Sequence, residues 1–127
     1  MLRGSQVLIF SENKQKVLLV RRNDYPIWTL PGGRKEPGEN YQKTAIRETK
    51  EETGLNVKLI KYLGKYHRAW YMRTDSVTAV FIGRKISGQL TLNDEASALK
   101  YWPVNKLPLN MLPYLRKRIN DGLASLG

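Results

Sequence analysis

The sequence predicts an α/β fold in which one mixed β-sheet lies between helices. Three observations lead to this prediction. The 127 residues are enough for a single domain, covering residues 1–127, with a substantial core. Short apolar segments rich in β-forming residues come before and between two segments with helical periodicity. Elements in this order pack as a sheet whose faces are covered by helices.

The N-terminal part is expected to form strands. Residues 7–10 and 17–20 are short apolar segments separated by polar residues, and they predict a hairpin buried on both faces. Residues 28–30 form a shorter extended piece, which ends at the Pro-Gly-Gly sequence of residues 31–33. A loop is expected to follow, because Pro37 and Gly38 are typical of turns.

The first helix is expected between residues 40 and 53. Asn40 is a suitable N-cap, and Gly54 can adopt the positive φ that ends a helix. The later elements are strands at residues 55–66, 77–82 and 98–102 and a helix at 114–126. This last helix carries an apolar stripe formed by Leu115, Ile119, Leu123 and Leu126.

The composition excludes several classes of protein. With no cysteine, the chain forms no disulfide and no thiolate metal site. No apolar run approaches the roughly 20 residues that span a bilayer, and no signal-length apolar segment follows the start. We therefore expect a cytoplasmic protein without a membrane partner.

The charges are unevenly distributed. There are 22 Lys and Arg against 11 Asp and Glu, which gives a formal charge of +11. Five of the eleven acids lie within the seventeen residues 36–52, whereas the basic residues are spread along the chain. A basic surface attracts polyanions such as nucleotides or RNA, and it is equally compatible with a solvated surface that aids solubility.

Three glutamates of the first helix share one face. At about 100° per residue, Glu51 and Glu52 lie at roughly −60° and +40° from Glu48. Like charges at these spacings destabilise a helix by a few tenths of a kcal/mol each. Mg²⁺, which prefers oxygen ligands, would relieve this repulsion. Neighbouring bases on a solvated helix face would relieve it as well, and the spacing alone leaves both interpretations open.

The opposite face of this helix is expected to pack on the sheet. It carries Ala45, Ile46, Thr49 and Thr53.

A longer pattern surrounds the three glutamates. It resembles the Nudix box, G-x5-E-x7-R-E-U-x-E-E-x-G-U, in which U is a bulky apolar residue. The matching residues are Gly33, Glu39, Arg47, Glu48, Glu51, Glu52, Gly54 and Leu55. Thr49, in the first U position, is the one departure, and it affects packing more than chemistry. The order of the other elements extends the resemblance to nearly the whole chain.

This resemblance implies a Nudix-type α/β/α sandwich and a Mg²⁺-dependent pyrophosphohydrolase, with Mn²⁺ as a possible substitute. Carried over by position, the metal ligands are Glu48, Glu51, Glu52 and the Gly32 carbonyl. Arg47 would orient a ligating glutamate, and Glu39 would help to fix the start of the helix. Glu48 is the first choice for the general base.

Three further candidates lie outside the box. Glu95 resembles the loop acid that reaches the same metals in many members of the family; the alternative is a solvated turn residue. Arg22, at the end of the second predicted strand, and Tyr71 are candidates for substrate binding. Arg22 is equally compatible with a plain surface arginine.

The remaining candidates are the only histidine, His67, and the large aromatic residues. His67 is interpreted as an ordinary strand or loop residue. Packing is favoured over base stacking for the aromatics, which are Trp28, Trp70, Tyr71 and Trp102.

The substrate implied by the family is a nucleoside diphosphate linked to another moiety. A small nucleotide such as a nucleoside triphosphate is the leading expectation. The basic charge keeps open an RNA 5′-end substrate. A Nudix-like module that binds a nucleotide without cleaving it is the alternative from another class. The chain is expected to act as a monomer or a homodimer.

Overall fold

A computed structural model describes residues 2–67 and 76–127. Trp70 and Tyr71 therefore lie outside the described residues. The elements follow one another as β1 (Leu2–Ile9), β2 (Lys16–Arg22), β3 (Trp28–Thr29), β4 (Gly32–Arg34), α1 (Tyr41–Thr53), β5 (Leu55–His67), β6 (Ser76–Gly88), β7 (Ala96–Pro103) and α2 (Pro113–Leu126).

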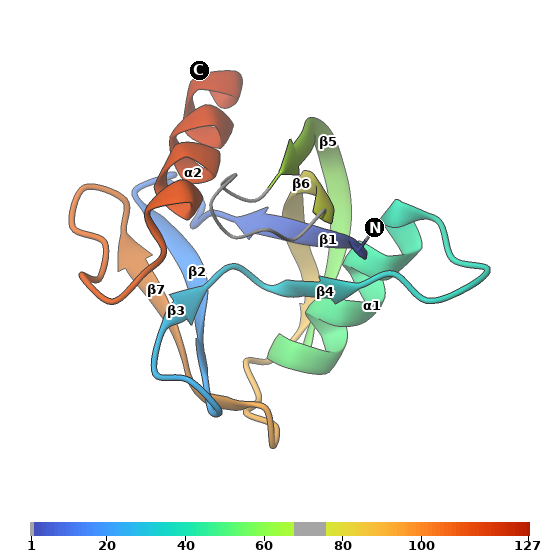
Figure 1. The fold of residues 1–127 in the computed structure, drawn as a ribbon. Helices are drawn as coiled ribbons and strands as arrows, with labels where there is room; N and C mark the ends of the chain where they lie inside the picture. The colour runs from blue at the N-terminus through green and yellow to red at the C-terminus, as the bar shows by residue number, and fades with distance from the viewer. Residues whose placement is uncertain (1, 68–75) are drawn as a thin grey trace.

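The strands form two sheets. The larger sheet has the order β4-β1-β6-β5, and the smaller one has the order β3-β2-β7. β1 pairs parallel with β6 and antiparallel with β4, so the larger sheet is mixed. The two helices lie on opposite sides of β1 (Figure 1). The prediction of an α/β/α arrangement around a mixed sheet is thus confirmed.

β1 is buried on both of its faces, because successive side chains of a strand point to opposite faces. Val7 and Ile9 belong to the apolar cluster that includes Ala45 of α1. Leu8, between them, belongs to the cluster that includes Leu115 and Ile119 of α2. β1 therefore links the two halves of the core.

The prediction that β1 and β2 form a hairpin is wrong, except for one pair of residues next to the turn. Phe10 and Val17 form a single antiparallel bridge, and the Ser11 N–H donates to the Lys16 carbonyl at 2.9 Å. The two strands then enter different sheets. The reason is that β4 and β6 pair with the two edges of β1, which leaves no edge for β2.

β4 is a strand where a loop was expected. Ser5 and Gln6 of β1 pair with Gly33 and Gly32. The close approach depends on glycine: Gly32 has φ +154°, and a Cβ on it would overlap the Ser5 carbonyl oxygen. Two glycines carry no alternating side-chain pattern, so periodicity could not reveal this strand.

The ends of α1 were predicted correctly. The Asn40 side chain accepts a hydrogen bond from the Lys43 N–H at 2.7 Å, which caps the first turn. Gly54 has φ +81°, and its N–H donates to the Lys50 carbonyl at 2.9 Å.

The packing face of α1 differs by one residue from the prediction. Its buried side chains are Thr44, Ala45, Thr49 and Thr53. Ile46 is 41% exposed, so its predicted contact with the sheet is wrong. Small residues on the buried face let the helix approach the sheet closely.

α2 packs through the predicted stripe. Leu115 and Ile119 are fully buried, and Leu123 and Leu126 pack against the same cluster. None of the helices in the described residues combines the length and apolar character needed to cross a membrane.

Replacing Asn40 by alanine should lower the free energy of unfolding by about 1 kcal/mol, because the Lys43 N–H loses its acceptor. Urea denaturation followed by circular dichroism measures the change. Gln42→Ala, at an exposed position of the same helix, is the control and should change stability by less than about 0.5 kcal/mol. Equal effects of the two substitutions would contradict the capping role.

Candidate active site

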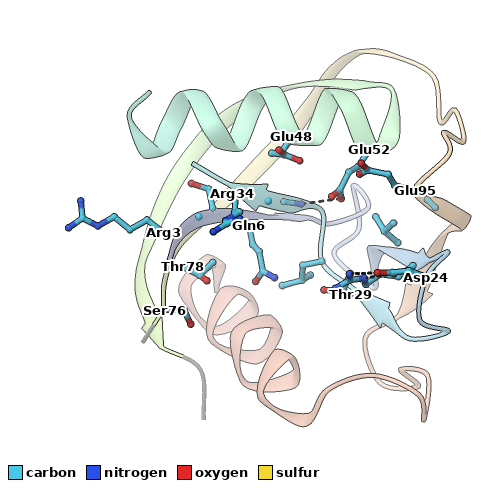
Figure 2. A pocket seen from close by; sticks show the side chains of 18 of the residues that line it. Arg3, Gln6, Asp24, Thr29, Arg34, Glu48, Glu52, Ser76, Thr78 and Glu95 are labelled. Atoms are coloured by element: carbon cyan, nitrogen blue, oxygen red, sulfur yellow. Dashed lines mark hydrogen bonds and ion pairs between the residues drawn. The ribbon is translucent and has the colours of Figure 1, made fainter. Parts of the chain in front are cut away.

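A cleft of about 880 Å³ lies where α1, β4, the end of β2 and the loop before β7 meet (Figure 2). Five residues predicted for the site line it: Gly32, Glu48, Glu52, Arg22 and Glu95. They come from four different parts of the chain, so the fold brings together groups that are as much as 73 positions apart, counting from Arg22 to Glu95.

The backbone of β4 faces α1 on its open edge. The Val7 N–H donates to the Pro31 carbonyl, and the Lys35 N–H donates to the Arg3 carbonyl, both at 2.9 Å. Along an antiparallel strand, the residues that bond the neighbouring strand alternate with residues whose N–H and C=O point the other way. Gly32 is of the second kind, so its N–H and C=O point away from β1. The Gly32 N–H accordingly donates to Glu52 Oε2 at 3.3 Å. The predicted role of the Gly32 carbonyl is compatible with this placement.

Gly33 allows the Glu48 carboxylate to lie directly on the strand. A Cβ added to Gly33 would lie 2.5 Å from Glu48 Cδ and Oε2. The contact explains in steric terms why a glycine precedes the helix at this spacing: any side chain would displace the carboxylate from the cleft.

Arg47 connects the acidic residues around the helix. Its Nε donates to Glu39 Oε2 at 2.7 Å, and its Nη2 donates to Glu39 Oε1 at 2.9 Å. Nη1 donates to Glu48 Oε1 at 2.8 Å and to Glu51 Oε2 at 3.2 Å. Nη2 also donates to the Arg34 carbonyl at 3.1 Å. One guanidinium thus joins α1 to β4 and to the loop between them.

Glu39 fixes the start of α1, as predicted. Besides Arg47, its Oε1 accepts from the Glu36 N–H and the Thr44 hydroxyl, both at 3.0 Å. These hydrogen bonds, chiefly those from Arg47, lower the pKa of Glu39 to about 2. In turn, hydrogen bonding to Glu39 raises the pKa of Arg47. Both groups are therefore charged over the whole physiological range.

In contrast to Glu39, the cleft carboxylates of Glu48 and Glu52 have raised pKa values. The pKa of Glu52 is raised to about 8, chiefly by burial and also by the charges of Glu48 and Glu95, which outweigh the opposing effects of the Gly32 N–H and Arg22. Burial also raises the pKa of Glu48, although Arg47 opposes the shift. The charge of Glu95 thus helps to raise the pKa of both Glu48 and Glu52.

The loop that carries Glu95 is held by Asn93 and Asn23, which were not predicted from the sequence. Asn93 Nδ2 donates to the Glu51 carbonyl at 2.6 Å, and its Oδ1 accepts from the Glu95 N–H at 2.9 Å. The Asn23 N–H donates to the Glu95 carbonyl at 2.9 Å. The Asn93-Asp94 pair is a turn signal that could have indicated an ordered loop.

Two predicted residues are engaged with other partners. Glu51 does not line the cleft; its side chain is 57% exposed and contacts Arg47. Arg22 lines the cleft and donates to both carboxylate oxygens of Asp24, at 3.0 and 2.7 Å. The hydrogen bonds to Asp24 raise the pKa of Arg22.

The aromatic and histidine candidates in the described residues lie away from the cleft. Trp28 is 8% exposed and packs edge-to-face on Trp102, with ring centroids 5.1 Å apart. His67 is exposed at the end of β5. These positions agree with the packing and surface interpretations. Tyr71 and Trp70 are outside the described residues.

The chemistry of the cleft suits a hard divalent cation. Within residues 2–67 and 76–127, no three acidic or histidine side chains already converge on one point. Glu48, Glu52 and Glu95 nevertheless face one cleft, and the like charge of Glu95 helps to raise the pKa of Glu48 and Glu52. A bound cation would remove this repulsion, and it requires only carboxylate oxygens, which are the donors that Mg²⁺ prefers. The residues present therefore fit the metal.

The raised pKa of Glu52 predicts a pH-dependent stability. Between its ordinary pKa of 4.5 and about 8, the unfolded chain loses a proton that the folded protein keeps, so stability falls as pH rises. In EDTA, Glu52→Gln should remove this loss and be more stable than the wild type at pH 8, by an amount on the order of 1 kcal/mol or more. Urea unfolding at pH 4 and pH 8 measures the difference.

Glu12→Gln is the control for that experiment, because Glu12 is exposed and lies outside the cleft. Its stability should follow that of the wild type at both pH values. Parallel pH profiles for Glu52→Gln and the wild type would contradict the burial of an ionisable Glu52.

The comparisons with known proteins agree with the geometry. The family model described as NUDIX domain matches residues 2–123. A Bacillus subtilis (strain 168) protein named "Putative 8-oxo-dGTP diphosphatase" is 39% identical over 119 residues, which cover 93% of this chain and 77% of that protein. An ADP-ribose pyrophosphatase of Methanocaldococcus jannaschii is 37% identical over 101 residues, covering 76% of this chain and 60% of that protein.

A solved structure extends the likeness to three dimensions. The crystal structure of an ADP-ribose pyrophosphatase from Streptococcus suis 89-1591 superposes with a TM-score of 0.82 at 25% identity. The match covers 98% of this chain and 91% of that one. Together with the box geometry around Arg47, these likenesses show that the chain belongs to the Nudix hydrolase family.

Proposed function

We propose that this Nudix hydrolase is a Mg²⁺-dependent pyrophosphohydrolase that cleaves a small nucleotide, such as a nucleoside triphosphate, by attack of water at phosphorus. The observation that carries the proposal is the group of three carboxylates, Glu48, Glu52 and Glu95, around one cleft. Their mutual repulsion is relieved by a divalent cation, which a diphosphate substrate also requires.

The charge distribution of the cleft supports a phosphate substrate. Arg34 lines the same cleft as the acidic residues, whereas the side chain of Arg3, which also borders the cleft, extends away from them (Figure 2). Arg22, at the end of β2, lines it as well. Arginine binds phosphate oxygens through two parallel N–H groups. Acidic residues for a cation and basic residues for phosphate oxygens, in one cleft, match the two charged parts of a metal–diphosphate complex.

In the proposed site, Glu48, Glu52 and the Gly32 carbonyl hold the metal, and Glu95 reaches it from the loop. Glu51, the remaining ligand predicted from the sequence, contacts Arg47 at the rim, and we propose that it contributes less to metal binding than Glu48 and Glu52. When bound, Mg²⁺ offsets the negative charge that develops as water attacks phosphorus.

Glu48 is the proposed general base. Its carboxylate lies against Gly33, and one oxygen accepts from Arg47, so its position is defined from two sides. In the metal-free site, burial raises the pKa of Glu48, the direction that favours a general base. Arg47 acts as the residue that orients it.

The relatives support a nucleotide as the substrate. Their names refer to 8-oxo-dGTP and ADP-ribose, which both contain a nucleoside diphosphate linked to another group. The formal charge of +11 favours an RNA 5′ end as the second candidate, because phosphate backbones attract basic surfaces.

A substrate panel tests the proposal. It contains the common nucleoside triphosphates, 8-oxo-dGTP, ADP-ribose and a 5′-triphosphorylated RNA, each with Mg²⁺, Mn²⁺ or EDTA. We expect turnover of at least one nucleotide that EDTA abolishes and that Glu52→Gln lowers by at least about 100-fold, because a metal ligand is lost. Phosphate release after coupled phosphatase treatment measures the rate.

The outcomes of the panel distinguish the alternatives. If the wild type cleaves no compound faster than the Glu52→Gln variant does, the hydrolase proposal fails. Tight nucleotide binding without turnover would favour the non-catalytic alternative. A preference for RNA that weakens steeply with salt would favour the RNA candidate, whereas salt-insensitive turnover of nucleotides alone would exclude it.

Glu51→Gln should lower kcat/KM much less than Glu52→Gln, by about tenfold or less, because Glu51 is largely exposed and lies outside the cleft. Parallel kinetics of the two variants on the best nucleotide measure the difference. Equal losses would instead mean that Glu51 leaves Arg47 and joins the metal ligands.

A further inference from the structure

We propose that Gln6 is a specificity-determining residue, which donates a hydrogen bond from its amide nitrogen to an acceptor on the nucleoside moiety of the substrate. Arg118 is the positioning residue that orients this amide. The inference rests on the proposed function, since it assigns the part of the cleft that receives the group attached to the diphosphate.

Arg118 is a buried cation between two aromatic rings. It is 2% exposed on α2, and its guanidinium lies 5.2 Å from the centroid of the Tyr66 ring and 4.9 Å from that of Tyr114. The Tyr66 hydroxyl donates to Asp121 at 2.8 Å, so this ring is itself fixed. The guanidinium therefore has a defined position and plane.

The contact with Arg118 determines which way the Gln6 amide faces. Arg118 Nη1 donates to Gln6 Oε1 at 2.6 Å. A guanidinium only donates hydrogen bonds, so the amide atom next to it has to be the oxygen. The Gln6 Nε2 then points away from Arg118. In the described residues, Gln6 makes no other side-chain hydrogen bond, so both N–H groups of Nε2 remain available to a ligand.

Gln6 lies next to the proposed metal centre. On β1 its Cα is paired with that of Gly32, and a Cβ on Gly32 would come within 2.9 Å of Gln6 Cγ. Side chains alternate along β1, so Gln6 shares the α2 face with Leu8. This face continues the cleft beyond Gly32, away from the carboxylates of α1 (Figure 2).

The neighbouring strand adds polar groups to the same floor. Ser76 and Thr78 of β6 line the cleft, and they share a face with Val80 and Ile82, which pack toward α2. Ser76 is only 7% exposed, and its hydroxyl has no hydrogen-bond partner among the described residues. Because this oxygen is itself buried, Ser76 contributes to the wall of the cleft, and the half-buried Thr78 presents the hydroxyl.

The cleft thus has two chemically different ends. The carboxylates of α1 and of the loop before β7, with Arg22, occupy one end, where a metal–diphosphate complex fits, whereas Arg34 lies beside Gln6 (Figure 2). The floor at Gln6 and Thr78 offers a neutral amide and a neutral hydroxyl group. Neutral donors of this kind pair with the carbonyl oxygens, ring nitrogens and hydroxyl oxygens of a nucleoside, and they carry no charge with which to attract phosphate.

Gln6→Met removes the donors at nearly constant side-chain length. We expect KM for the best of ATP, GTP, CTP and UTP to rise about tenfold, with kcat changed by less than about threefold. The inhibition constant of inorganic tripolyphosphate, which lacks a nucleoside, should change by less than about twofold. Gln15→Met, at an exposed position outside the cleft, is the matched control and should change neither constant.

The pattern of losses identifies the acceptor. Unequal increases in KM among the four nucleotides would assign it to the base, and equal increases would assign it to the sugar. An equal weakening of tripolyphosphate, or no change for any nucleotide, would overturn the inference. If Gln6→Met is poorly folded, Gln6→Glu keeps an acceptor for Arg118 and should raise KM by at least as much.

A double-mutant cycle tests the positioning role of Arg118. Arg118→Met should raise KM in the wild-type background and have no further effect on KM in Gln6→Met, because the amide that it orients is already absent. Arg118→Lys, which keeps a donor, should restore part of the affinity. Equal effects of Arg118→Met in both backgrounds would indicate a structural role only and would overturn the assignment.

The measurements separate this inference from the proposed function. If the wild type cleaves no nucleotide, the proposed function fails, and equilibrium binding of the same four nucleotides by calorimetry still tests Gln6. Weaker binding to Gln6→Met with unchanged tripolyphosphate binding would then support the inference alone. Active wild type with an unaltered Gln6→Met variant would overturn the inference and leave the proposed function intact.

Discussion

The site depends on the hydrogen bonds of a single guanidinium, that of Arg47. The helix α1 carries glutamates at spacings where like charges repel, and the same helix has to lie close to the backbone of β4. Arg47 offsets part of this repulsion by binding Glu48 and Glu51, and it joins the helix to Glu39 and to the Arg34 carbonyl. Charge-assisted hydrogen bonds of this kind are stronger than neutral ones and fix geometry. The acidic helix, the preceding loop and the strand therefore form one unit.

The features that could be predicted from the sequence are mainly local. Asn40 and Gly54 define the ends of α1 through contacts within one turn, and the glutamate spacing places Glu48 and Glu52 on one side. The features that were missed depend on distant segments. β4 exists because two glycines fit against β1, and β2 leaves β1 because β4 and β6 already pair with it. Likewise, the position of the Asn93 side chain is fixed by its hydrogen bond to the carbonyl of Glu51, which is 42 residues away in the sequence.

The structure also separates residues that helical geometry alone treats as equivalent. Glu48, Glu51 and Glu52 share a helix face, yet only Glu48 and Glu52 line the cleft, while Glu51 points to the rim. The difference arises because β4 covers one side of that face. The carboxylates of Glu48 and Glu52 are consequently less easily ionised than exposed glutamates. Ionising them lowers the stability of the folded protein, and both belong to the Nudix box, the motif that characterises the family. The proposed site thus lowers the stability of the fold locally, while the apolar clusters on both faces of β1 stabilise it.

The short strand β4 has one further consequence, for association between molecules. A strand at the border of a sheet offers unpaired N–H and C=O groups, to which a strand of another molecule can add. In β4 the outward N–H of Gly32 is bonded to Glu52, and the outward carbonyl of Arg34 is bonded to Arg47. The side chains of the proposed site thus also block intermolecular β-pairing at this border. The opposite border, β5, is thirteen residues long and has lysines at positions 58, 61 and 65, whose like charges on two molecules repel each other.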